Sequence, residues 1–121
     1  MSNRILVVED QEDNRRIVRD LLTTTDYEVT EAENGEEALA AVARQRPDLI
    51  LMDIQLPVMD GYEATRRIKA DPALREIPII AVTSDALSGD EEKARAAGCD
   101  DFVPKPYSPR QLLAKIRKFL P

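Results

Sequence analysis

A short, unbroken run of apolar residues, Leu49 to Met52, ends on a carboxylate at Asp53. An apolar run without polar alternation is typical of a strand that is covered on both faces, as in a parallel sheet between two layers of helices. Turn residues follow at once, at Leu56-Pro57 and Asp60-Gly61. A charged side chain at the end of a buried strand costs free energy unless it is solvated or has a chemical role. Asp53 is therefore either the solvated end of a strand or a functional residue.

Four further segments have the residue pattern of strands. Three are short and mostly apolar, at Ile5–Val8, Pro78–Thr83 and Asp101–Pro104. The fourth, Tyr27–Ala32, alternates between apolar and polar residues, which is typical of a half-exposed edge strand. Together with the run that ends at Asp53, these segments predict five strands.

Helical segments separate these strands. The first is predicted over residues 12–24, with Ile17, Val18, Leu21 and Leu22 on its buried face. The other four begin at N-cap signals, and each signal is a short polar side chain. Three of these caps, with the expected helix ends, are Asn34 (before Pro47), Asp60 (about Ala70) and Ser88 (Gly98). Ser108-Pro109 begins the last helix, which is expected to face the core through Leu112, Leu113, Ile116 and Leu120.

The fourth of these helices, predicted from Ser88 to Gly98, has weak apolar anchors. Only alanines, at positions 94, 96 and 97, are available to pack against a core. Burial of an alanine removes little apolar surface from water, so we expect this helix to be the least firmly held. Gly98 is expected to end it in a left-handed conformation.

The strand–helix alternation, repeated five times over 121 residues, predicts one domain spanning residues 1–121. Parallel strands joined by right-handed crossovers place helices on both faces of the sheet. The expected fold class is α/β, a flavodoxin-like (βα)5 three-layer sandwich with a five-stranded parallel sheet in order 2-1-3-4-5. Ligands of such folds bind beyond the carboxyl ends of the strands, beside the switch between strands 1 and 3.

Composition excludes several classes of function. The net charge of −6 argues against direct binding to nucleic acid or to an anionic membrane. No apolar run approaches the roughly 20 residues of a membrane span. The single cysteine, Cys99, allows no internal disulfide, which fits a cytoplasmic location best. The chain has no histidine, so no histidine-based catalysis can come from it.

Polar side chains gather at the carboxyl ends of four predicted strands: Glu9 and Asp10, Asp53, Thr83 and Lys105. Converging carboxylates repel one another, and a bound divalent cation with hard oxygen ligands, most naturally Mg2+, would relieve that repulsion. A carboxylate beside such a metal can act as a phosphoryl acceptor. Lys105 would neutralise the phosphoryl oxygens, and the Thr83 hydroxyl would donate a hydrogen bond to one of them.

Each residue also has an ordinary explanation. Acids are favoured at helix N-termini, threonine ends many strands, and Lys-Pro is a common loop dipeptide. Convergence of all of them at one edge of the sheet is what favours a functional site.

Four motifs resemble the receiver domain of two-component response regulators, in particular the single-domain chemotaxis and cell-cycle regulators. They are Ile-Leu-Val-Val-Glu9-Asp10, Leu-Met-Asp53-Ile-Gln-Leu-Pro-Val-Met-Asp-Gly, Ala-Val-Thr83-Ser and Phe102-Val-Pro-Lys105-Pro106. They cover the chain from end to end, and the set is highly specific to this family.

The resemblance implies a role for each matching position. Asp53 would be the phosphoacceptor, and Mg2+ would be held by Asp10, Asp53, the main-chain carbonyl of Gln55 and, through water, Glu9. Thr83 and Lys105 would contact the phosphoryl group. The Lys105-Pro106 bond is expected to be cis.

Phe102 matches a switch position of the family that is often tyrosine, and its alternative role is that of a core side chain. Phenylalanine has no hydroxyl group with which to report burial or exposure. Gln55 and Asp85 flank the expected site, where they would tune the access of water to the phosphate.

Three alternative functions fit the sequence less well. A flavodoxin would need a hydroxyl- and amide-rich loop after the first strand, where this chain has Glu-Asp-Gln-Glu-Asp. An aspartyl phosphohydrolase usually has a second acid two residues after its nucleophile, where this chain has Gln55. A receiver-shaped interaction domain without phosphorylation would not need the full set of acids, threonine and lysine.

The resulting prediction is a stand-alone phosphorylatable switch that is not a separate enzyme, although it assists its own phosphorylation and dephosphorylation. The donor would be a histidine kinase or a histidine phosphotransfer protein. Phosphorylation would change the surface around helix 4, strand 5 and helix 5 for partner binding or phosphorelay. The chain ends directly after the fifth predicted helix, so the output is expected to be a protein contact or a relay, unless the sequence is a receiver excised from a longer protein.

Overall fold

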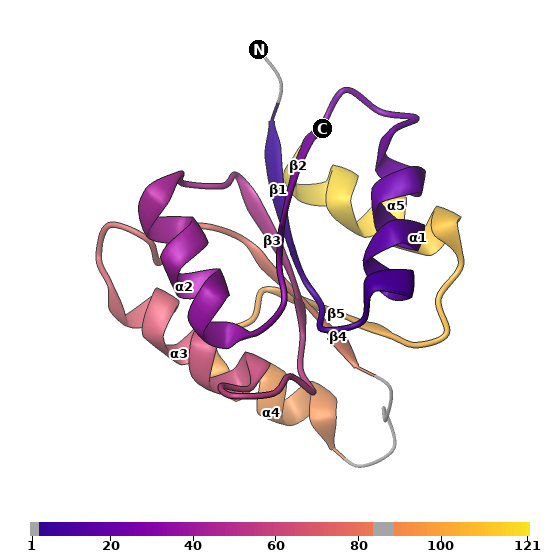
Figure 1. Cartoon of the computed structure of the whole chain (residues 1–121). Helices are drawn as coiled ribbons and strands as arrows, with labels where there is room; N and C mark the ends of the chain where they lie inside the picture. The colour runs from indigo at the N-terminus through magenta and orange to yellow at the C-terminus, as the bar shows by residue number, and fades with distance from the viewer. Residues whose placement is uncertain (1–2, 84–88) are drawn as a thin grey trace.

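The computed structural model describes residues 3–83 and 89–121 (Figure 1). Strands and helices alternate along the chain, as the sequence predicts. They are β1 (Arg4–Val8), α1 (Glu12–Leu22), β2 (Glu28–Ala32), α2 (Gly35–Arg44), β3 (Leu49–Asp53), α3 (Gly61–Ala70), β4 (Ile79–Thr83), α4 (Asp90–Ala97), β5 (Asp101–Pro104) and α5 (Pro109–Phe119).

The five strands form one parallel sheet in the order β2-β1-β3-β4-β5, which confirms the predicted topology. The register sets which side chains meet at the carboxyl edge. Asp53, the last residue of β3, pairs with Val82 of β4, so Thr83 lies one residue further along its strand. Thr83 in turn pairs with Pro104 of β5.

Helices cover both faces of the sheet, with α2, α3 and α4 on one face and α1 and α5 on the other (Figure 1). Two buried apolar clusters fill the two interfaces, because alternate residues of a strand point to opposite faces. The cluster under α2, α3 and α4 contains Leu6, Val8, Ile50, Met52, Ile79 and Ala81. The cluster under α1 and α5 contains Ile5, Val7, Leu49, Leu51, Ile80 and Val103.

Most of the predicted helix ends are confirmed. The side chains of Asn34, Asp60 and Ser108 accept hydrogen bonds from backbone N–H groups in the first turns of α2, α3 and α5. Helix α4 instead begins at Asp90 with Gly89 at its N-cap position, and the predicted cap Ser88 lies outside the described residues. Gly98 ends α4 with φ of 112°, as predicted.

The prediction for α1 was wrong in two respects. The helix ends at Leu22, and the hydroxyl groups of the three following threonines donate to backbone carbonyls of its last turn. Ile17, predicted to be buried, is 61% exposed. The buried face is formed by Arg15, Val18 and Leu22, and Ile17 lies about 100° from Val18 around the helix axis.

Smaller differences concern strand starts and the membrane. Strand β2 begins at Glu28 and β4 at Ile79, each one residue later than predicted. Within residues 3–83 and 89–121, the structure contains no helix with the length and apolar character needed to span a bilayer.

Candidate functional site

Asp53 occupies the last position of β3 and is only 7% exposed. Strand alternation directs its side chain to the same face as Leu51, towards α1 and α5. The start of α3 packs closely against this strand end, since the Gly61 N–H donates to the carbonyl of Ile54 at 3.0 Å. A Cβ atom at Gly61 would lie 2.3 Å from the carbonyl oxygen of Asp53, so only glycine fits there.

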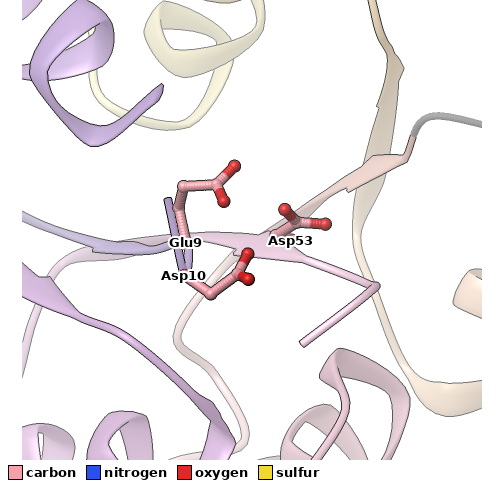
Figure 2. A group of neighbouring side chains, drawn as sticks. All are labelled: Glu9, Asp10 and Asp53. Atoms are coloured by element: carbon pink, nitrogen blue, oxygen red, sulfur yellow. The ribbon is translucent and has the colours of Figure 1, made fainter. Parts of the chain in front are cut away.

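Three carboxylates meet at this edge of the sheet. Glu9 and Asp10 follow β1, and Asp53 ends the neighbouring strand β3. Each side chain supplies an oxygen that lies within 4.8 Å of the others. Figure 2 shows the Asp10 carboxylate turned towards that of Asp53, with the Glu9 carboxylate above both in this view.

Lys105 supplies positive charge to this cluster. Its Nζ donates to Glu9 Oε1 at 2.9 Å and to Asp53 Oδ2 at 3.2 Å. Its backbone N–H also donates to the carbonyl of Thr83 at 2.6 Å, which ties the loop after β5 to the end of β4. The Lys105-Pro106 bond is cis, as predicted.

Burial and charge separate the pKa values of the two buried acids. Burial, and then the adjacent Glu9 carboxyl, raise the pKa of Asp53 to about 6, although Lys105 opposes the shift. Burial alone would raise the pKa of Glu9, but hydrogen bonds from the Gln11 N–H and from Lys105 outweigh it and lower that pKa to about 2. Partial desolvation and Glu9 raise the pKa of Asp10. Both buried acids are ionised at neutral pH.

The donor set fits a hard divalent cation. Carboxylate oxygens are the ligands that Mg2+ takes from proteins, and it binds through one or two of them while keeping several waters. Lys105 pairs with two of the three carboxylates, so the cluster keeps an excess of negative charge for such an ion to neutralise. The Gln55 N–H donates to Asp53 Oδ1 at 3.0 Å, which places the Gln55 main chain beside the acid. The role of the Gln55 carbonyl as a metal ligand stays a prediction.

The other two predicted site residues, Thr83 and Phe102, belong to the opposite face of the sheet. Thr83 is fully buried, and its Oγ1 donates to Asp90 Oδ2 at 2.5 Å. Phe102 is buried in the core under α2, α3 and α4. This placement agrees with the core role considered for Phe102 and does not test its role as a switch. Asp85 lies outside the described residues.

Two side chains that contact the site were not predicted. Arg15 is buried, donates through Nη1 to the carbonyl of Glu9 at 2.8 Å, and forms ion pairs with Glu31 and Glu33. The available signal was its spacing of three and seven residues from Val18 and Leu22, which places it on the buried face of α1.

Asp90 is the second, and it accepts hydrogen bonds from Thr83 and from Tyr62. Nothing in the sequence distinguished it from the two glutamates that follow it.

Comparison with known proteins identifies relatives among response regulators. The sequence model of the response regulator receiver domain matches residues 5–117. The polar-differentiation response regulator DivK of Brucella anthropi is 45% identical over 120 residues, which cover 99% of this chain and 98% of the relative. DivK of Brucella ovis is 43% identical over the same length and coverage.

Solved structures of receiver domains and response regulators have the same fold as this chain. The receiver domain of the sensor histidine kinase PA1611 of Pseudomonas aeruginosa PAO1 was solved with a magnesium ion coordinated in its active-site cleft. It is 40% identical, with a TM-score of 0.92 and coverage of 99% of this chain and 98% of that one. Chemotaxis protein CheY4 of Vibrio cholerae is 28% identical, with a TM-score of 0.91 and coverage of 98% and 99%.

Proposed function

This chain belongs to the response regulator receiver domain family of two-component systems, and we propose that Asp53 is its phosphoacceptor. The observation that carries this proposal is the position of Asp53 between two further carboxylates and Lys105. Phosphorylation of Asp53 then controls the signalling state of the domain. The chemistry is performed once per signalling event on its own side chain, so the chain is not a separate enzyme.

The proposed step is attack of an ionised Asp53 oxygen on the phosphorus atom of a phosphohistidine. A P–O bond forms, the P–N bond breaks, and the departing imidazole nitrogen keeps the electron pair. A pKa of about 6 leaves Asp53 ionised at neutral pH. Lys105 holds one carboxylate oxygen and the Gln55 N–H holds the other, so the nucleophile is oriented before the donor arrives.

Charge at the site favours a phosphoryl group once a cation is present. Mg2+, held by Asp10, Asp53 and the Gln55 carbonyl with Glu9 acting through water, would neutralise negative charge on the phosphoryl oxygens. Lys105 supplies a second positive charge, and Thr83 supplies a hydroxyl donor. Dephosphorylation is attack of water on the same phosphorus atom, which releases phosphate and restores the Asp53 carboxylate.

The phosphohistidine must come from outside these 121 residues, because they contain no histidine. We place its docking surface at the exposed side chain of Ile17, which lines an open pocket with Asn14, Lys105, Pro106 and Tyr107. The pocket lies beside the lysine that touches Asp53. A histidine kinase or histidine phosphotransfer protein bound there would bring its phosphohistidine next to the acceptor.

The output surface is proposed to lie at the β5 edge of the sheet, where α4 covers one face and α5 the other. The backbone bond between Lys105 and Thr83 and the contact between Thr83 and Asp90 link the acceptor to β5 and α4. Phe102, buried beneath α4, is the side chain expected to respond to a change there. The cytoplasm is the proposed location, because histidine kinases present their phosphohistidine there.

Incubation with Mg2+ and a small phosphodonor tests the acceptor. We expect wild type to gain one base-labile phosphoryl group and Asp53→Ala to gain none. Incorporation by Asp53→Ala at the wild-type rate would show that the acceptor is another residue. Ile17→Lys is the matched test of docking: transfer from the protein donor should fall, whereas transfer from the small phosphodonor should not change.

A further inference from the structure

Asp90, the first residue of α4, connects three elements through one carboxylate. It is only 8% exposed. Oδ2 accepts a hydrogen bond from Thr83 of β4 at 2.5 Å, and Oδ1 accepts one from the Tyr62 hydroxyl of α3 at 2.9 Å. Burial, and then donation to Asp90, raise the pKa of Tyr62, so its hydroxyl stays protonated and remains a donor. The carboxylate is therefore held in one orientation from two sides.

The direction of Thr83 follows from the sheet. Asp53 pairs with Val82, and both side chains belong to the face covered by α1 and α5. Thr83 is the next residue of β4, so its side chain belongs to the face covered by α3 and α4. The hydroxyl assigned to the phosphoryl group thus points towards Asp90 in this structure.

A threonine hydroxyl has one proton to donate. While that proton is shared with the Asp90 carboxylate, it is not available to a phosphoryl oxygen on Asp53. Resting on the proposed function of Asp53 and Thr83, we propose that Asp90 is a positioning residue, which holds the Thr83 hydroxyl in the unphosphorylated protein and competes with the phosphoryl group for its proton.

The competition makes Asp90 a regulator of the equilibrium between the two states. A ligand shifts a two-state equilibrium only by its differential affinity for the states. The free energy by which the bond between Thr83 and Asp90 stabilises the resting state lowers the binding free energy of a phosphoryl group by the same amount. Asp90 begins α4, so transfer of the hydroxyl to the phosphoryl group also changes what holds the start of that helix.

Titration with beryllofluoride, a phosphoryl mimic, in the presence of Mg2+ tests the proposal. Fluorine NMR gives the dissociation constants of wild type, Asp90→Ala, Asp90→Asn and the control Glu92→Ala, an exposed acid in the same turn. Asp90→Ala should bind about fivefold to tenfold more tightly, since a hydrogen bond to a charged acceptor no longer opposes binding. Asp90→Asn keeps an acceptor oxygen and should stay nearer to wild type. Equal gains in Asp90→Ala and Glu92→Ala would overturn the proposal in favour of a general effect of charge.

The same titration in a Thr83→Val background separates the hydrogen bond from the charge. With no hydroxyl present, Asp90→Ala should leave the dissociation constant unchanged. A gain that persists in Thr83→Val means that Asp90 acts only by repelling the anion, and the proposal is then wrong. Failure of the proposed function has a different signature: wild type then binds no beryllofluoride, or the double variant Thr83→Val, Asp90→Ala binds it as tightly as Asp90→Ala alone. Melting temperatures of all variants show that each one is folded.

Discussion

Asp53 and Asp101 are both buried carboxylates on strands, 7% and 3% exposed, but their surroundings are opposite. Asp101, on β5, accepts from Lys115 Nζ at 2.9 Å and Lys118 Nζ at 3.0 Å, and its own Oδ1 accepts from the Phe102 N–H. Asp53 shares its single lysine, Lys105, with Glu9. Two lysines pair with the one acid Asp101, whereas one lysine pairs with the two acids Glu9 and Asp53.

The pKa values follow this difference. Burial would raise the pKa of Asp101, but the two lysines outweigh it and the pKa is lowered. Burial raises the pKa of Asp53 as well, and Glu9 adds to the shift. The Asp101 carboxylate is stabilised in its charged form by its own two lysines, whereas the negative charge around Asp53 is only partly balanced, as its proposed role requires.

The largest expected effect is at Asp101. Asp101→Asn removes the charge that two lysines and a backbone N–H contact, and should lower the free energy of unfolding by about 2–3 kcal/mol. Urea denaturation of wild type and variant measures it. Asp100 and Asp13 are poor controls, because they form ion pairs with Lys69 and Arg16, so Asp26→Asn, at an exposed aspartate in the loop after α1, is the control. An unchanged midpoint for Asp101→Asn would show that its lysines contribute nothing.

Asp53→Asn should act in the opposite direction. Carboxylates about 5 Å apart repel by roughly 3 kcal/mol at an effective dielectric constant near 20, and Lys105 offsets part of this. In EDTA we expect Asp53→Asn to be more stable than wild type by about 1–2 kcal/mol, or some 3–7 °C in melting temperature. A melting temperature equal to or below that of wild type would mean that Lys105 already compensates the cluster.

Mg2+ should distinguish the two acids. We expect the ion to bind the folded carboxylate cluster and not the unfolded chain, and so to raise the melting temperature of wild type. The Mg2+-induced stabilisation should be about 1 kcal/mol smaller in Asp53→Asn, and unchanged in Asp101→Asn. Equal Mg2+ effects in all three proteins, measured by thermal melts with and without the ion, would place the metal elsewhere.

The smallest expected effect is a pH dependence. A carboxyl whose pKa is raised on folding destabilises the fold above that pKa, and the penalty is relieved as pH falls from about 6 towards its usual 3.8. The stability advantage of Asp53→Asn over wild type should therefore shrink by about 1 kcal/mol when the pH of the measurement is lowered from 7.5 to 5.

The lowered pKa of Asp101 has the reverse effect on stability. The free energy that the Asp101 carboxylate contributes is present above its unfolded pKa and is lost only in stronger acid. The difference between wild type and Asp101→Asn should stay constant over the same range.

The acids and the lysine of the site were predictable because parallel strands end at one edge of a sheet. Residues that follow β1, β3 and β5 must then meet, whatever the details of packing. The exposed position of Ile17 was not predictable in this way, since the periodicity of α1 fits more than one choice of buried face. Arg15 occupies that face and only the structure shows that its guanidinium is paired.

The contact between Thr83 and Asp90 was missed for a different reason. Strand order was predictable, but the register that pairs Asp53 with Val82 is set by packing and is not written in the apolar pattern. A shift of one residue would have turned Thr83 to the face of Asp53. The N-cap signal at Ser88 also predicts a helix start before Asp90, which is the residue that begins α4.

The alternation of side chains along β3 and β4 bears on how such a chain can diverge in evolution. Asp53 and the proposed donor surface at Ile17 lie on one side of the sheet, whereas Thr83, Asp90 and Phe102 lie on the other. Duplicated copies can therefore acquire new donors through substitutions on α1 while α3 and α4 stay unchanged. The reverse route, a new target with the old donor, is equally open. Donor specificity carried by α1 and target specificity carried by α4 can therefore be inherited separately, whereas α5 shares the face of α1.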